Sequence, residues 1–506
     1  MKKMPLTILS IISALFITFL FHNHPLGLNL VLFELTTIVV FFIQKQINLK
    51  SFFSIGSTIV LVLSSTFTLI THSNFVYIMN YISLMLFIGV HLYPTSKSLV
   101  TSFYISIVHF IQSQKQFLTR LFNTKINGWK LGKYIWKFRI FILPIVLILI
   151  FLILYSNSNP IFQRLFCSLE NFIIDLFKII VNTIEFSKLF TLFIGLIISN
   201  YVFIKTTNNK MIQYDSNSND TFFRNRKRNN ANSSFLGLKN ELKSALFLFT
   251  SLNILLLILN SIEINSVWFN FEWTGSTLKT FVHDGTYLLI VSILLSIGLV
   301  LYYFRNNMNF YQKNKFLKTL TYLWLIQNGI LVFSVLVRNY WYIKIYSLAH
   351  LRIGLIIFLA LTLFGLYSVF IKVYKCKSLY YIFKVNFLGA FLLLTVCSFV
   401  NWDRVIAKYN VSQSNTSYFH FDYLANLSDA TLPITDLNIE QLETIESIHH
   451  IKFSTQKNKL NPERYIKHMS LRKVKFITKW KSKSILSWNL AEYLVYEKLS
   501  KTTPKD

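Results

Sequence analysis

The chain has 506 residues, of which 53% are hydrophobic and only 14% are charged, and its mean hydropathy is +0.47. These values exclude a single soluble globular core and are typical of a polytopic membrane protein. The three cysteines, Cys167, Cys376 and Cys397, lie far apart. The sequence therefore offers no intramolecular disulfide framework and no cysteine-rich metal site.

The formal net charge of +30 is concentrated between apolar stretches. Residues 97–139 contain eight Lys or Arg and no Asp or Glu, and residues 205–243 include the run "RNRKRNN". Such segments are typical of cytoplasmic loops that face anionic lipid headgroups. We expect the bilayer with its anionic headgroups as a partner and no nucleic acid, because no aromatic-interleaved basic domain is visible.

About eleven apolar stretches are long enough to cross a membrane, since about 20 helical residues span a hydrocarbon core of ~30 Å. They lie near 4–21, 28–44, 51–71, 75–94, 140–156, 189–204, 244–262, 286–304, 319–337, 353–371 and 385–401. The predicted fold class is all-α, a polytopic transmembrane helical bundle of about eleven spans.

The loops predict the orientation of the chain. Lys2 and Lys3 precede the first span, and "HNHPLG" after it contains no Lys or Arg. The positive-inside bias then places the N-terminus in the cytoplasm, and an odd number of spans places the C-terminus on the opposite, extracytoplasmic side. The segment 338–352 conflicts with this arrangement, because it carries several basic residues on the supposedly external side.

The predicted division is an N-terminal membrane region at 1–138, a membrane core at 139–400 and a small exported α or α/β domain at 401–506. Two segments, 98–113 and 166–186, have the spacing of interfacial amphipathic helices. The polar loop near 206–238 is predicted to be disordered.

Several strings in the second half of the chain resemble one family. They are "HDGTYLLIVSILLSIGLVLYYFRNNMNF" at 283–310, "LWLIQNGILVFSVLVRNYWYI" at 323–343 and "NWDRVIAKYNV" at 401–411. Together they resemble an uncharacterised bacterial polytopic membrane family, domain of unknown function 4173, related to 4153. The resemblance implies a bacterial cytoplasmic (inner) membrane protein and supplies no activity, cofactor or catalytic residue. The Gly-Leu-Thr typical of the family appears here as Ser347, Leu348 and Ala349.

Glu34 stands about midway along the second predicted span and is the only acidic residue among the first 169. A carboxyl group there must be protonated or paired. It is either a proton or cation site or a hydrogen-bonding contact between helices, and the sequence favours the second.

His283 and Asp284 precede the apolar part of the 286–304 span. Asp284 is positioned to cap the start of a helix, and the two together would form an external pH-responsive or metal-binding pair only if further ligands lay nearby. Gln327 and Asn328 lie near the centre of the 319–337 span, where amides hold neighbouring helices together or, less simply, line a polar pocket.

Arg338 and Arg352 flank an aromatic-rich segment between two spans. An interfacial girdle of Trp, Tyr and basic residues explains them, and an external site for an anionic lipid or glycan is the functional alternative.

No Walker motif, dinucleotide fingerprint, His-Glu-x-x-His or Gly-x-Ser-x-Gly is present, so we expect neither a cofactor nor a metal. The leading hypothesis is a non-enzymatic envelope sensor, scaffold or accessory subunit with a membrane or envelope protein partner. The alternatives are a transporter of a small polar or amphiphilic solute and, third, a membrane glycosyl- or lipid-transferase. The transferase is disfavoured because the first external loop contains no carboxylate.

Overall fold

The fold is all-helical in a computed structural model, which describes residues 6–48, 51–123, 125–126, 129–130, 144, 148, 186–206, 209–223, 234–271, 275–305, 307–453 and 459–502. In these residues the only strands are two short ones, β1 (Lys125–Ile126) and β2 (Trp129–Lys130), which pair antiparallel. Apart from residues 144 and 148, the predicted span 140–156 falls outside the described residues, as do Cys167 and the predicted amphipathic segment 166–186 up to residue 185.

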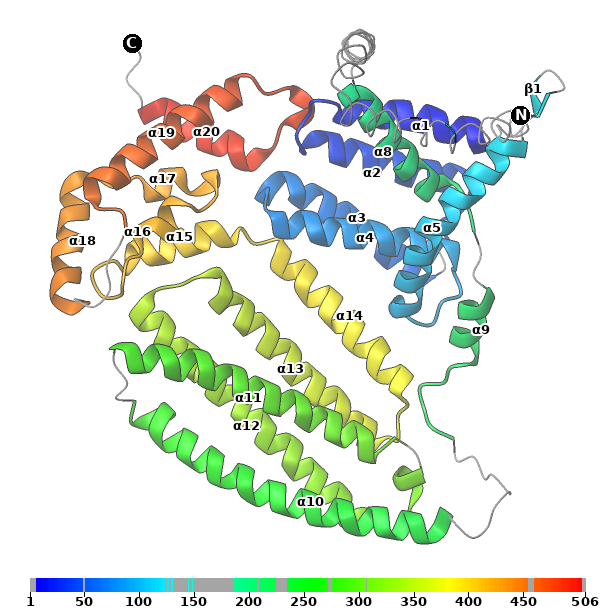
Figure 1. Cartoon of the computed structure of the whole chain (residues 1–506), viewed down its shortest axis with the longest axis vertical. Helices are drawn as coiled ribbons and strands as arrows, with labels where there is room; N and C mark the ends of the chain where they lie inside the picture. Colours follow the sequence, from blue (N-terminus) through cyan, green and yellow to red (C-terminus); the bar gives the residue numbers. More distant parts are fainter. Residues whose placement is uncertain are drawn as a thin grey trace.

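The first bundle comprises α1 (Leu6–Phe21), α2 (Leu28–Ile43), α3 (Phe52–Thr71), α4 (Asn74–Leu92), α5 (Leu99–Asn123) and α8 (Phe186–Phe203). Helix α8 packs along α1 and α5 although it is far from them in sequence (Figure 1). Gly195 on α8 makes this approach close, because a Cβ there would lie 3.0 Å from the Ala14 carbonyl oxygen.

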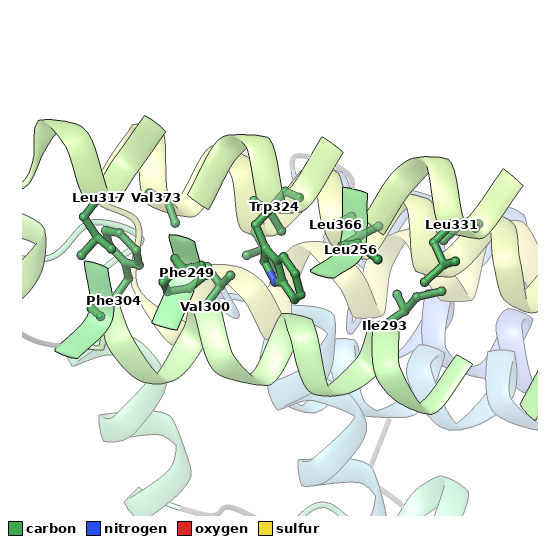
Figure 2. Packing of buried hydrophobic residues seen from close by; sticks show 14 of the residues in the cluster. Phe249, Leu256, Ile293, Val300, Phe304, Leu317, Trp324, Leu331, Leu366 and Val373 are labelled. Carbon is green, nitrogen blue, oxygen red and sulfur yellow. The ribbon is translucent and has the colours of Figure 1, made fainter. Parts of the chain in front are cut away.

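The second bundle comprises four long helices, in which α12 lies at the centre and packs against each of the other three. They are α10 (Ser234–Glu263), which continues as the π-helix η1 (Ile264–Phe269), α11 (Gly275–Tyr303), α12 (Lys315–Tyr346) and α13 (His350–Tyr374). A short 3-10 helix, η2 (Asn307–Phe310), joins α11 to α12. Their shared core includes Phe249 of α10, Val300 of α11, Trp324 of α12 and Leu366 of α13 (Figure 2).

Helix α14 (Leu379–Ser398) joins the two bundles. It contacts α13 on one side and α4 and α5 on the other (Figure 1). Phe391 on α14 is buried in one cluster with Met79, Leu86 and Val90 of α4. The two bundles therefore share a continuous apolar contact through this helix.

Eight described helices are long and apolar enough to cross a membrane, and two shorter apolar ones, Ile8–Phe21 and Leu28–Ile43, precede them. Side chains on these helices leave many apolar groups at the surface, such as Phe19, Leu255 and Leu295. Lipid rather than water suits such a surface. The protein is therefore a multi-pass membrane protein, and the count of eleven spans stays a prediction.

The described parts of residues 402–502 form a helical C-terminal unit (yellow to red in Figure 1). Its elements are α15 (Trp402–Ser412), α16 (Phe421–Ala425), η3 (Asp429–Thr431), α17 (Leu432–Thr435), α18 (Ile439–Lys452), α19 (Pro462–Lys481), η4 (Ile485–Ser487) and α20 (Leu490–Thr502). Phe419, Phe421 and Tyr465 are fully buried at its centre. Ile353 of α13 belongs to the same cluster, so this core extends onto the second bundle.

The membrane helices have two chemically different ends. At one end the C-terminal unit lies on the turns that join α1 to α2, α3 to α4 and α12 to α13 (Figure 1). At the other end, described parts of the basic stretches meet: Asp215, at the end of α9 (Asn209–Asn217), accepts hydrogen bonds from Lys97 N at 2.9 Å and from the Tyr380 hydroxyl at 2.5 Å. We call these the unit end and the basic end.

The prediction of disorder near 206–238 is wrong for residues 209–223. Ser378 Oγ donates to Asn219 O at 2.6 Å, and Lys384 pairs with Asp220 at 3.1 Å, so this stretch is fastened to the start of α14. Residues 234–238 are also helical, because they begin α10.

Helix α5 contains the predicted amphipathic segment 98–113, but its polar face points into the protein. Ser102, Ser106 and His109 are buried, whereas Ile107 and Ile111 are exposed. The His109 ring contacts the Tyr201 carbonyl oxygen at 2.8 Å and the Thr206 hydroxyl at 2.6 Å. This polar face packs against α4 and α8, and α5 is not among the described helices that are long and apolar enough to cross a membrane. Its placement as an interfacial helix stays a prediction.

Glycine 89 on α4 provides a test of the close packing between α4 and α5. A Cβ at this position would fall on the Ser102 carbonyl oxygen, which is backbone and cannot move aside. We predict that Gly89→Ala lowers the thermal unfolding midpoint, since overpacking costs ~1–3 kcal/mol. Gly56→Ala on α3 is the matched control, because nothing lies within 4 Å of a Cβ there; equal midpoints for the two variants would contradict the packing.

Candidate functional site

Glu34 is the one acidic residue in the described part of the first bundle, and it is buried. It lies on α2 with 0% of its surface exposed, and Asn80 of α4 donates to its Oε2 at 3.0 Å. The same Asn80 amide donates to Ser64 Oγ of α3 at 3.2 Å. Three helices therefore meet at one polar cluster, which agrees with the predicted contact between helices.

This cluster contains polar atoms without partners. Among the described residues, Glu34 Oε1, Asn80 Oδ1 and Ser65 Oγ are buried and accept or donate no hydrogen bond. No described Lys, Arg or His forms an ion pair with the carboxyl group. Asn260 Oδ1, Gln327 Oε1 and Asn328 Oδ1 are also buried without a partner, but among the described residues Glu34 is the one carboxyl group with such an atom.

Gln327 and Asn328 belong to a polar seam between α10 and α12. Gln327 Nε2 donates to Asn253 Oδ1 at 2.8 Å, and Asn253 and Asn260 donate to the carbonyl oxygens of Leu320 and Gln327, both at 3.1 Å. Asn253 and Asn260 lie seven residues apart on α10, and their acceptors Leu320 and Gln327 lie seven residues apart on α12, as expected for parallel helices. Gln327, Asn253 and Asn260 therefore hold α10 to α12, whereas the Asn328 amide donates to Trp324 O of its own helix.

Arg338 forms a buried ion pair that the sequence did not indicate. Its Nε donates to Glu263 Oε2 at 3.0 Å and its Nη2 to Glu263 Oε1. Both side chains are about 5% exposed, so the charge of Arg338 is balanced within the protein. Glu263 lies where α10 becomes the π-helix η1. A π-helix has more residues per turn than an α-helix, so the side chains that follow point in other directions than they would in a continued α-helix.

The predicted capping role of Asp284 is wrong. Helix α11 begins at Gly275, so Asp284 lies well inside it and not at its start. The next residue, Gly285, faces Arg338, because a Cβ there would lie 2.7 Å from Nη1. The structure thus brings the chain at His283 and Asp284 to the Arg338–Glu263 pair, but it does not describe the side chains of His283 and Asp284.

The basic residues Arg352 and Lys344 of the segment 338–352 have partners within the protein. The Arg352 guanidinium lies 4.5 Å from the Tyr342 ring centre and donates to Tyr346 O, and Lys344 Nζ lies 4.9 Å from the Trp341 ring centre. Helix α12 extends to Tyr346, so only residues 347–349 form the turn. These basic groups are held by carboxylate, carbonyl and aromatic partners and are not free loop charges.

The C-terminal unit is bonded to both bundles at the unit end. On the first bundle, Leu28 N donates to Trp488 O at 3.0 Å and Asn401 Nδ2 donates to Thr71 O at 3.0 Å. On the second, Leu348 N donates to Asn410 Oδ1 at 2.8 Å. Gly27 is needed here, because a Cβ would lie 2.5 Å from the Ser487 carbonyl group.

Two Tyr–His–carboxylate groups reinforce these contacts. At the end of α3, His72 Nε2 lies 3.3 Å from Glu492 Oε1 of α20, and the Tyr77 hydroxyl lies 2.7 Å from His72 Nδ1. At the start of α13, His350 Nε2 lies 2.7 Å from Asp403 Oδ1 of α15, and the Tyr423 hydroxyl lies 2.8 Å from His350 Nδ1. Each bundle is thus joined to the unit by a histidine held between a tyrosine and a carboxylate.

Both carboxyl groups have lowered pKa values. Burial would raise the pKa of Glu492, but hydrogen bonds and charges from His72 and Lys483 outweigh it and lower the pKa from 4.5 to about 2. Burial likewise opposes ionisation of Asp403, yet hydrogen bonds from His350 and Ser428 keep its pKa below the usual value. Both groups are carboxylates near neutral pH.

Arg404 and His449 have partners inside the C-terminal unit. Arg404 donates to the Ala430 and Ala491 carbonyl oxygens, while the neighbouring Asp403 pairs with His350. His449 is 6% exposed and accepts from Phe419 N at 3.1 Å. Burial also lowers the pKa of His449, which favours the neutral ring.

Ser347 stands where the family resemblance leads us to expect glycine, and its backbone conformation explains that expectation. Its backbone has φ 62° and ψ −179°, a conformation that side chains disfavour and glycine adopts freely. Here the Ser347 hydroxyl offsets part of that cost by donating to Tyr418 O of the C-terminal unit at 2.8 Å.

The chain belongs to the family described as domain of unknown function DUF4153, whose match covers residues 10–437. The match includes the first bundle, which the sequence motifs had not indicated, while the related number 4173 is not shown. No curated protein and no solved structure matches the chain. The family has no assigned activity, ligand or catalytic residue, so the function of this chain is inferred from its own residues.

Sequence reasoning missed Glu263, Asn80 and the two histidine contacts. Glu263 directly follows the predicted span 244–262, and its acidic side chain at a helix end looked like an ordinary boundary residue. Asn80 lies in a span, where an amide is a detectable signal, but nothing in the sequence joins it to Glu34. His72 and His350 are each separated from their carboxylate partners by more than fifty residues.

A double-mutant cycle tests the Arg338–Glu263 pair. We predict that Glu263→Gln or Arg338→Gln alone lowers stability by ~3–5 kcal/mol, because each leaves an unbalanced buried charge. The combined variant should lose less than the sum of the two. Thermal unfolding in detergent measures all four proteins, and additive losses would show that the pair is not coupled.

Glu492→Gln tests the docking of the C-terminal unit. We predict faster cleavage of the unit by protease, because the charge-assisted hydrogen bonds to His72 and Lys483 together contribute ~1.5–3 kcal/mol. Since the folded-state pKa is below 4.5, this contribution is present above that pH and is lost as pH falls toward about 2. Glu497→Gln, at an exposed position on the same helix, is the control; an equal effect there would contradict the assignment.

Proposed function

We propose that this protein is a non-enzymatic sensor, scaffold or accessory subunit of the bacterial cytoplasmic membrane. In this proposal the basic end faces the cytoplasm and its anionic headgroups, and the C-terminal unit faces the extracytoplasmic side. The charge distribution supports the orientation through the positive-inside bias. The partner would be a membrane or envelope protein, and nucleic acid has no part in it.

The observation that carries the proposal is the position of the C-terminal unit. It is fastened to the first bundle through His72 and Glu492 and to the second through His350 and Asp403. A protein unit that contacts both bundles changes its contacts whenever the bundles move relative to one another. It can therefore report a change in the membrane region to a partner on the same side.

A transporter of a small polar or amphiphilic solute is the second candidate. The buried and incompletely bonded Glu34 favours it, because transporters place such carboxyl groups on substrate or ion pathways. Gln327 and Asn328 lend it less support, since the amide nitrogens of both are used in contacts along α10 and α12.

A growth experiment separates the two candidates. We predict that a strain carrying Glu492→Gln together with His350→Ala behaves like a gene deletion under envelope stress, because the unit is loosened from both bundles. Glu34→Gln should grow like the wild type under the same stress. The opposite result, a deletion phenotype for Glu34→Gln and normal growth for the docking variant, would favour the transporter; immunoblots of membrane fractions control for expression.

A further inference from the structure

The cluster around Glu34 has the composition of a site for a small cation. Five side-chain oxygens come together from three helices: the two of Glu34 on α2, those of Ser64 and Ser65 on α3, and that of Asn80 on α4. All four residues are at most 1% exposed. Oxygen donors of this kind suit hard cations and not soft metals.

The hydrogen bonds within the cluster leave it incomplete. Asn80 donates from Nδ2 to Glu34 Oε2 and Ser64 Oγ, whereas Glu34 Oε1 and Asn80 Oδ1 remain without a partner in the described part of the chain. Ser65 Oγ lies beside the Glu34 carboxyl group but outside the geometry of a good hydrogen bond. A half-turn of the Asn80 amide exchanges its NH2 group and its oxygen, which would direct Oδ1 to the carboxyl side without moving the helix. All five oxygens could then point to one centre.

The charge of the cluster favours a monovalent cation over a divalent one. The cluster contains one carboxylate, and no described basic side chain pairs with it. A buried charge without compensation is strongly unfavourable, so one positive charge must accompany the ionised form. A monovalent ion leaves the cluster neutral, whereas a divalent ion would leave an excess positive charge in the bundle.

We propose that Glu34, Ser64, Ser65 and Asn80 form a binding site for a monovalent alkali cation, Na⁺ in the first instance. A bound ion satisfies the three unpartnered oxygens at once and links α2, α3 and α4. Protonation of Glu34 competes with it, because a proton neutralises the same carboxylate. Among the described residues, the Tyr81 hydroxyl on α4 is the other titratable group that interacts with Glu34.

The first measurement uses the purified full-length protein in detergent. We predict that its thermal midpoint rises with Na⁺ concentration to a plateau at about pH 8, whereas K⁺ and choline at equal ionic strength have less effect. Binding of radioactive sodium should saturate over the same range. At about pH 5 the sodium response should shrink, because protons compete for Glu34.

Glu34→Gln should abolish both sodium responses, and Ser65→Ala should shift them to higher Na⁺ concentration while the protein stays folded. Glu241→Gln is the matched control, because Glu241 is a partly exposed acid at the basic end, 3.8 Å from Arg305. Its sodium responses should equal those of the wild type.

Three results would overturn the proposal. One is an equal response of the wild type to Na⁺, K⁺ and choline at both pH values, which would mean screening or protonation alone. Another is a sodium response that survives in Glu34→Gln, which would place the ion elsewhere. The third is an infrared band of a neutral carboxylic acid that persists in saturating Na⁺ at about pH 8 and disappears in Glu34→Gln, since it would show a permanently protonated Glu34. None of these results depends on the sensor or scaffold proposal, because all are measured on purified protein.

Discussion

A polar group inside lipid has to find its partner within the protein, and this requirement shapes the contacts between the membrane helices. The amides of Asn253, Asn260 and Gln327 hold α10 to α12, and Arg338 is balanced by Glu263. The buried serines and His109 of α5 face inward while Ile107 and Ile111 face out. In water these groups could have been solvated, but in the hydrocarbon they become the specific contacts between helices.

The same requirement explains how much of the fold could be predicted. Long apolar stretches must be helical in lipid, so the periodicity and length of the sequence predicted helices at the positions where the described ones occur. Helix ends were less predictable. Asp284 looked like a cap because the apolar run begins beside it, whereas α11 starts at Gly275 and carries polar residues through its first turns. Hydropathy marks the part of a helix in lipid and not the helix itself.

The candidate site was predictable only in part. Glu34 stands out in sequence because a carboxyl group is rare and costly in an apolar span. Its partners Ser64, Ser65 and Asn80 are ordinary residues whose importance comes from how α2, α3 and α4 pack. The contacts of His72 with Glu492 and of His350 with Asp403 likewise depend on the C-terminal unit folding back onto the membrane helices. Short-range patterns carry no information about such distant pairs.

The central claim is that the helices cross lipid with the C-terminal unit at one end and the basic segments at the other. Cysteine labelling tests it most directly, with Lys481→Cys in the unit and Lys313→Cys at the basic end, each in a chain whose three natural cysteines are replaced by serine. A membrane-impermeant reagent should label the two positions from opposite sides, Lys481→Cys in intact cells and Lys313→Cys only after lysis. Labelling of both positions from the same side would contradict the account.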